Sequence, residues 1–223
     1  MDNLLTIILS LGVTLCSAYL CYQYTVHHAE DGFGIRKLFA PKLVKMPLIV
    51  AIVSWLLSVG VYLYCALHGG DSFFRSVMNA EVFLWLAFLG YIDFRERIIP
   101  NVMIGVGLVS WLALVLIDIF AGGTPAGDLL MFSLAGGLIS GGVLLIISLI
   151  SKSALGMGDV KLFTVLGLLY GLTDTYSVLL FSVVIMAVVS IVLLLTKKAN
   201  RKTAIPMAPF VAIGFLLCIL AGM

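Results

Sequence analysis

Charged side chains are scarce in this sequence. Only 11% of its 223 residues are Asp, Glu, Lys or Arg, whereas 62% are hydrophobic. Soluble domains carry about 25% charged and about 45–50% apolar residues. A water-soluble fold cannot bury this much apolar surface, so the sequence predicts a protein whose solvent is the lipid bilayer.

Cysteine is also rare, with four residues and no C-x-x-C pair. Zinc sites and disulfide frameworks need regularly spaced cysteines, and isolated cysteines in apolar runs are typical of packing residues. His27 and His28 are adjacent and therefore lack the i,i+4 spacing that places two ligands on one helical face. We predict no metal, no cofactor and no nucleic-acid partner. The net charge of +2 by itself indicates little about partners.

Long apolar runs are abundant. A transmembrane helix needs about 20 predominantly apolar residues. Seven runs come near or reach this length, at about residues 4–22, 47–67, 77–92, 102–120, 129–150, 176–196 and 204–222, and an eighth, at about residues 160–172, is short for a full crossing. The sequence predicts an all-α, polytopic membrane helix bundle of about eight transmembrane helices. Two N-terminal helices with a short basic loop occupy residues 1–76, six more occupy residues 77–223, and all pack as one membrane domain.

The fifth run contains a G-x-x-x-G at Gly137 and Gly141. Small residues at this spacing let two helices approach closely in lipid. We expect close helix packing here.

The basic residues sort to one side of the membrane when alternate loops are assigned to the cytoplasm. Four lie in the first cytoplasmic loop, two in each of the next two and four in the last, so 12 of the 13 are inside and only Arg75 is outside. They are Arg36, Lys37, Lys42 and Lys45; Arg95 and Arg97; Lys152 and Lys161; and Lys197, Lys198, Arg201 and Lys202. The positive-inside rule then places both termini outside.

Two aspartates reach the same cytoplasmic face. Asp93 ends the third run and Asp159, in the sequence Gly156-Met157-Gly158-Asp159, precedes the sixth. Two carboxyl groups held close together share a proton, so that one acts as acid and the other as base on a water molecule. Such a pair can hydrolyse a peptide bond without a metal. Two alternatives stay open: Asp159 is only the N-cap of the helix beginning at Val160, or Asp93 only pairs with Arg97 one turn on.

Three segments resemble those of the bacterial type IV prepilin leader peptidase family, which are membrane aspartic proteases with a G-x-G-D motif. They are residues 91–101 (YIDFRERIIPN), residues 156–162 (GMGDVKL) and residues 205–214 (IPMAPFVAIG). The resemblance implies that Asp93 and Asp159 are the catalytic pair. Gly156 and Gly158 would give the supporting loop its backbone freedom, and Pro206 and Pro209 would form a structural motif near the site.

The same resemblance implies a substrate, a location and a reaction. The substrates would be prepilins or pseudopilins, cut after a glycine at the cytoplasmic face of the bacterial inner membrane. Glu30, Asp31 and Glu96 are candidates for contact with a basic leader, whereas Lys161 is interpreted as topogenic or lipid-facing.

The chain also departs from the larger family members. Those resemble it but carry a longer cytoplasmic insertion, often with paired C-x-x-C motifs, and methylate the new N-terminus. The loop at residues 23–46 contains no cysteine, which does not favour methyltransferase activity. Other hypotheses are an ion-coupled carrier using Glu81, an inactive scaffold of a secretion assembly, or a presenilin-like protease. The last class has Pro-Ala-Leu where this chain has Ala208-Pro209-Phe210.

Overall fold

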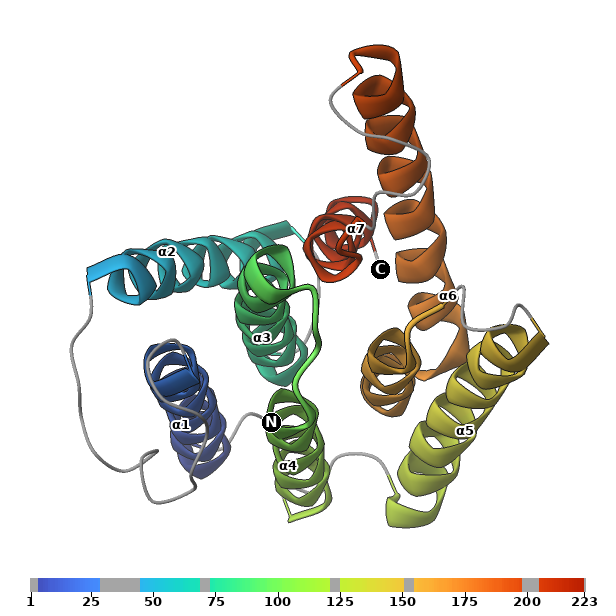
Figure 1. Cartoon of the computed structure of the whole chain (residues 1–223). Coiled ribbons are helices and arrows are strands. Elements are labelled where there is room, and N and C mark those ends of the chain that lie inside the picture. Colours follow the sequence, from blue (N-terminus) through green and yellow to red (C-terminus); the bar gives the residue numbers. More distant parts are fainter. Residues whose placement is uncertain are drawn as a thin grey trace. The chain divides into compact units, whose positions relative to one another are not determined.

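The structure is a computed structural model that describes residues 4–28, 45–68, 73–120, 125–150, 155–197 and 205–222. Within these residues every regular element is an α-helix (Figure 1). The helices are α1 (Leu4–His28), α2 (Lys45–His68), α3 (Phe73–Glu96), α4 (Asn101–Phe120), α5 (Ala126–Ile150), α6 (Met157–Leu195) and α7 (Ala208–Leu220). The all-α prediction is confirmed.

Five helices, α2 to α6, are long and apolar enough to cross a membrane. They also expose large apolar side chains, such as Leu57 on α2, Leu138 on α5 and Val188 on α6. Such surfaces are unfavourable in water and suit a lipid environment. The multi-pass membrane character is therefore supported, while the number of eight crossings and the outside position of the termini stay predictions.

The chain divides into two compact units. Unit 1 contains the residues up to Phe88 and from Val102 to Leu130, and unit 2 contains residues 89–101 and those from Met131 onward. The expected division into residues 1–76 and 77–223 separates the chain at a different place from these two units, and it stays a prediction.

Unit 1 is held together around α3. Trp85 on α3 donates its indole N–H to the Met103 carbonyl on α4 at 2.9 Å. Asn79 on α3 donates to the Cys65 sulfur on α2 at 3.5 Å. Buried polar groups need such partners, and these bonds fix the faces that α3 turns to its neighbours.

In unit 2 the first half of α6 packs tightly on α5. A Cβ at Gly137 would lie 2.6 Å from the Leu168 side chain, and Gly136 and Gly167 meet backbone to backbone. Ser133 on α5 adds a hydrogen bond of 2.7 Å to the Leu168 carbonyl. The close packing predicted from the small residues of this helix is confirmed.

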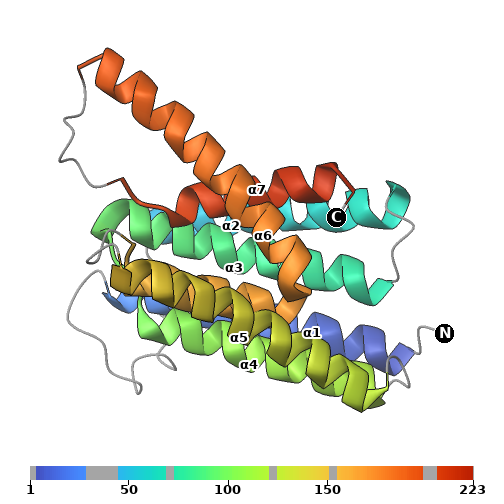
Figure 2. The ribbon, with the colours of Figure 1, turned by 90° about the vertical axis from the view of Figure 1, so that its right-hand side faces the viewer.

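Helix α6 is two helices joined at Gly171, whose φ of 70° and ψ of −166° are not helical. Figure 2 shows the sharp change of direction at this point. The expected sixth and seventh spans, residues 160–172 and 176–196, are thus the two halves of one element. The expected gap between them is wrong because a single glycine turns the chain without a loop.

Helix α7 packs along the second half of α6. Gly214 lies against the Ser182 backbone nitrogen, at 2.9 Å from where its Cβ would be. The Phe215 and Tyr170 rings meet edge to face with centroids 5.4 Å apart. Helix α7 begins at Ala208, not at the expected Ala204.

Candidate active site

Asp93 lies in the last turn of α3 and is 5% exposed. Its Oδ2 accepts a hydrogen bond of 2.9 Å from the backbone N–H of Ala208, the first residue of α7. The first N–H groups of a helix have no partner within the helix. The Asp93 carboxylate therefore caps a helix that begins 115 residues later in the sequence.

The chain turns away directly after Asp93. Helix α3 ends at Glu96, and Arg97 adopts a left-handed φ of 56° while its N–H bonds to the Asp93 carbonyl at 2.8 Å. The helix thus does not continue through Arg97, as the alternative interpretation of Asp93 required. The Asp93 side chain has its hydrogen bond with α7 instead.

A glycine brings α7 to this position. Gly90 lies one turn before Asp93, and a Cβ there would be 3.1 Å from the Cα of Pro209. Pro209 is in the first turn of α7, where its missing N–H costs no hydrogen bond. Pro206 lies just before the N-cap residue Met207. The structure thus places the first turn of α7, which contains Pro209, beside Asp93.

Asp159 is the third residue of α6. The N-cap is Gly156, to whose carbonyl the Asp159 N–H donates at 3.1 Å. The interpretation of Asp159 as the N-cap of a helix beginning at Val160 is therefore wrong, because the helix starts three residues earlier. Its half-buried carboxylate folds back so that Oδ2 lies 3.1 Å from where a Gly156 Cβ would be.

The two glycines supply space, not unusual backbone angles. Gly156 has an ordinary extended conformation, with φ −67° and ψ 141°. Gly158 is helical, and a Cβ there would lie 2.8 Å from the Cβ of Ile99. The expected role in backbone freedom is wrong for both positions, since what each requires is the close approach of a neighbour.

Asp93 and Asp159 are brought together within unit 2. Their carboxyl groups are close enough to interact through their charges. Each is held at the N-terminus of a different helix, α7 and α6 respectively. Two carboxyl groups can share a proton and polarise a water molecule when they lie close enough for one water to bridge them.

Further contacts around Asp159 were not expected from the sequence. Lys161 donates from Nζ to Oδ1 of Asn101 at 2.7 Å, so it is not simply a lipid-facing or topogenic charge. Ser148 on α5 donates to the Leu155 carbonyl at 2.9 Å, just before the Gly156 turn. The sequence did contain a signal for the Lys161–Asn101 contact: Asn101 lies in the segment 91–101 that contains Asp93, and Lys161 lies in the segment 156–162 that contains Asp159.

The other candidate residues lie elsewhere or outside the described part. Glu30 and Asp31 fall outside the described residues, and Glu96 is exposed at the end of α3. Among the described residues no group of three His, Cys, Asp or Glu side chains is arranged to hold a metal ion.

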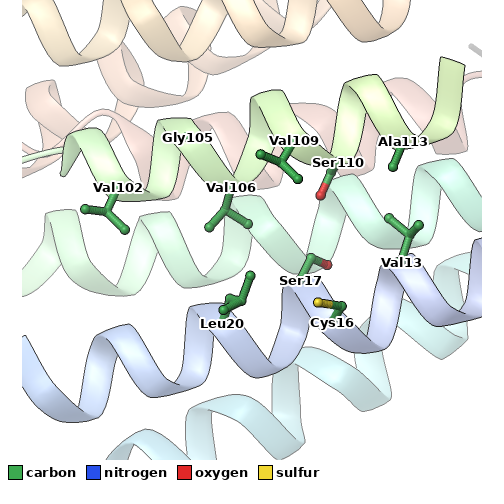
Figure 3. A pocket seen from close by; sticks show the side chains of 10 residues that line it. All are labelled: Val13, Cys16, Ser17, Leu20, Val102, Gly105, Val106, Val109, Ser110 and Ala113. Carbon is green, nitrogen blue, oxygen red and sulfur yellow. The ribbon is translucent and has the colours of Figure 1, made fainter. Parts of the chain in front are cut away.

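Glu81 lies in unit 1 and is 2% exposed, and neither of its carboxyl oxygens has a hydrogen-bond partner in the described part of the chain. An apolar cavity of about 530 Å³ also lies in unit 1, between α1 and α4. Figure 3 shows Ser17 of α1 and Ser110 of α4 among its lining residues. Neither aspartate of the candidate site lines this cavity.

Comparison of the sequence with models of known protein families gives a match to one family. Residues 81–191, which contain both aspartates, match the type IV leader peptidase family. No significant match was found among solved structures.

Curated relatives share the same printed name, prepilin leader peptidase/N-methyltransferase. The protein of Pseudomonas putida is 30% identical over 135 residues, which are 60% of this chain and 46% of that protein. The Bacillus subtilis protein is 34% identical over 79 residues, covering 35% and 32%. The Aeromonas hydrophila protein is 29% identical over 185 residues, covering 82% and 60%. The chain therefore spans between about a third and three fifths of these relatives.

Proposed function

The chain belongs to the type IV leader peptidase family, and from this membership we propose that it is a membrane aspartic endopeptidase. Its substrates are type IV prepilins or pseudopilins, from which it removes the basic leader. The N-methyltransferase activity in the relatives' names is not part of the proposal.

One observation carries this proposal: Asp93 and Asp159, from separate helices, present interacting carboxyl groups in one unit. A structural role for either residue alone would not require the other. Capping of α7 explains where the Asp93 carboxylate is held. It does not explain why Asp159 lies near it, because like charges in proximity are unfavourable unless they share a proton.

The reaction needs only these two groups and a water molecule. The ionised aspartate takes a proton from water as the oxygen attacks the scissile carbonyl carbon, and the protonated aspartate gives its proton to the carbonyl oxygen. The tetrahedral intermediate then collapses: the aspartate that took the water proton gives it to the leaving nitrogen as the C–N bond breaks, and the other aspartate takes a proton from a hydroxyl of the intermediate. The pair ends with one shared proton, as it began.

The proposed site suits a substrate with a basic leader in the cytoplasm and an apolar helix in the membrane. Asp93 and Asp159 each lie within four residues of one end of a candidate span. Cleavage after a glycine, at the cytoplasmic face of the inner membrane, is part of the proposal.

The test is processing of a prepilin in cells. We expect the unaltered chain, co-expressed with prepilin genes of its own genome, to generate substrates whose new N-terminus follows a glycine, as read by mass spectrometry. Asp93→Asn and Asp159→Asn should each reduce processing by at least about 1,000-fold, because each removes one member of the acid–base pair.

The matched control is Asp128→Asn, which alters an exposed aspartate in the first turn of α5. This variant should process normally, and all three proteins should accumulate equally in membranes. Normal processing by either Asp93→Asn or Asp159→Asn would rule out the pair. An unaltered chain inert toward every prepilin tested would support the scaffold hypothesis.

A further inference from the structure

A hydrogen bond joins the two aspartate segments beside the candidate site. The Lys161 ammonium, two residues after Asp159, donates to the Asn101 side-chain oxygen at 2.7 Å. Asn101 is the first residue of α4 and follows the turn that leaves Asp93. Both residues belong to unit 2.

The bond is made although both Lys161 and Asn101 are exposed. Holding a lysine side chain in one conformation costs up to about 2 kcal/mol of rotamer entropy. A charge-assisted hydrogen bond is shorter and about twice as strong as a neutral one. The acceptor is a side-chain amide, so the contact depends on the identity of both residues.

A second contact between the same segments lies on the other side of Asp159. Gly158 meets the Ile99 side chain, whose Cβ is 2.8 Å from where a Gly158 Cβ would be. The Ile99 contact and the Asn101 bond therefore bracket Asp159, one residue before it and two residues after it. Both come from the short segment that follows Asp93.

We propose that Lys161 and Asn101 are positioning residues that fix the first turn of α6, and with it the Asp159 carboxyl group, relative to Asp93. This inference rests on the proposed function for its catalytic consequence. Displacing a reacting group by about 1 Å costs about 100-fold in rate. Loss of the bond thus lowers turnover without removing any group that touches substrate.

The variants test the bond from both sides. Lys161→Met removes the donor and keeps the apolar stem, and Asn101→Leu removes the acceptor. Asn101→Asp and Lys161→Arg retain an acceptor and a donor, respectively. Lys197→Met is the matched control, because Lys197 is an exposed lysine at the far end of α6.

The activity assay uses the full-length chain in detergent micelles with a purified prepilin. Lys161→Met and Asn101→Leu should each lower kcat about 10- to 100-fold with KM changed less than about twofold. The double variant should be no slower than the slower single variant, since both remove one interaction. Asn101→Asp and Lys161→Arg should recover most of kcat, and Lys197→Met should match the unaltered chain.

A second measurement needs no activity. With Cys16, Cys21, Cys65 and Cys218 replaced by Ala, spin labels are attached to Ile98→Cys and Met157→Cys, which are exposed positions on the two segments. Adding Lys161→Met or Asn101→Leu should broaden or shift the distribution of distances between the labels, whereas adding Lys197→Met should not.

The two assays separate the possible failures. If the unaltered chain cleaves no prepilin but the distance between the spin labels depends on Lys161 and Asn101, the proposed function fails and the positioning role stands. If the unaltered chain cleaves while Lys161→Met and Asn101→Leu keep full kcat, the positioning role is overturned. The positioning role would also be overturned if Lys161→Met and Asn101→Leu lost kcat only in proportion to their loss of folded protein and Asn101→Asp did not recover it.

Discussion

At the scale of single residues, the candidate site depends on what its neighbours lack. Gly90 has no side chain to push α7 away from Asp93, and Gly158 has none to push Ile99 away from the turn that carries Asp159. Neither glycine has a positive φ. Their contribution is a short distance to the neighbouring segment, to the Pro209 backbone at Gly90 and to the Ile99 side chain at Gly158, which any larger residue would lengthen.

Gly158→Ala tests this contribution. The new methyl group would lie 2.8 Å from the Ile99 Cβ, so the loop or the first turn of α6 must shift. We expect processing of a prepilin to fall about 10-fold or more, since small displacements of reacting groups are costly. Gly142→Ala on α5 is the control, because a Cβ there meets nothing within 4 Å. Equal processing by the two variants would contradict the spacing argument.

At the scale of elements, α6 combines two helices with different partners. Its first half carries Asp159 and packs on α5, whereas its second half packs on α7, whose first N–H is capped by the Asp93 carboxylate. The two halves meet at Gly171, whose φ of 70° and ψ of −166° belong to a region adopted almost only by glycine. The kink therefore sets the direction from the first half of α6, which carries Asp159, to the second half, on which α7 packs.

Gly171→Ala should destabilise the protein. An alanine in this conformation costs of order 1–3 kcal/mol, and its Cβ would also meet the Phe132 ring. We expect a lower melting temperature in detergent and reduced processing. Gly105→Ala on α4, where a Cβ meets nothing within 4 Å, should melt at the same or a higher temperature. A melting temperature unchanged by Gly171→Ala would contradict the argument that the backbone conformation at Gly171 requires glycine.

At the scale of the whole molecule, the proposed function requires a fixed orientation in the membrane. The distribution of Lys and Arg predicts that the end of α3 and the start of α6 lie on the cytoplasmic side. The leader of a prepilin would be on the same side. If the orientation were reversed, the aspartates and the leader would be separated by the bilayer.

Cysteine labelling in intact cells tests this orientation. We expect a membrane-impermeant maleimide to label Asp128→Cys, at the predicted outer face, without permeabilisation. Arg95→Cys, beside Asp93, should be labelled only after the membrane is opened. Both positions are exposed, so access to the side chain does not limit labelling. Labelling of Arg95→Cys from outside would show that the orientation is the reverse of the predicted one, and it would refute cleavage at the cytoplasmic face.

The sequence by itself determined the class of the protein, because scarce charge and long apolar runs leave only a membrane environment. It also determined the family, since residues 91–101 and 156–162 carry its motifs in order. The all-α class was predicted correctly, and the number of eight crossings stays a prediction. Two of the expected segments form one kinked helix, because a periodic apolar pattern does not show that a glycine turns the chain without a loop.

Only the tertiary structure decided how the site is assembled. It brought the α7 N-terminus to Asp93, Ile99 to Gly158 and Asn101 to Lys161. Sequence patterns report which residues favour a helix or a membrane, and these are local properties. Contacts between segments far apart in the chain depend on how helices pack, and packing is set by shape and distance in three dimensions. For that reason the sequence named both aspartates but not the residues that hold them.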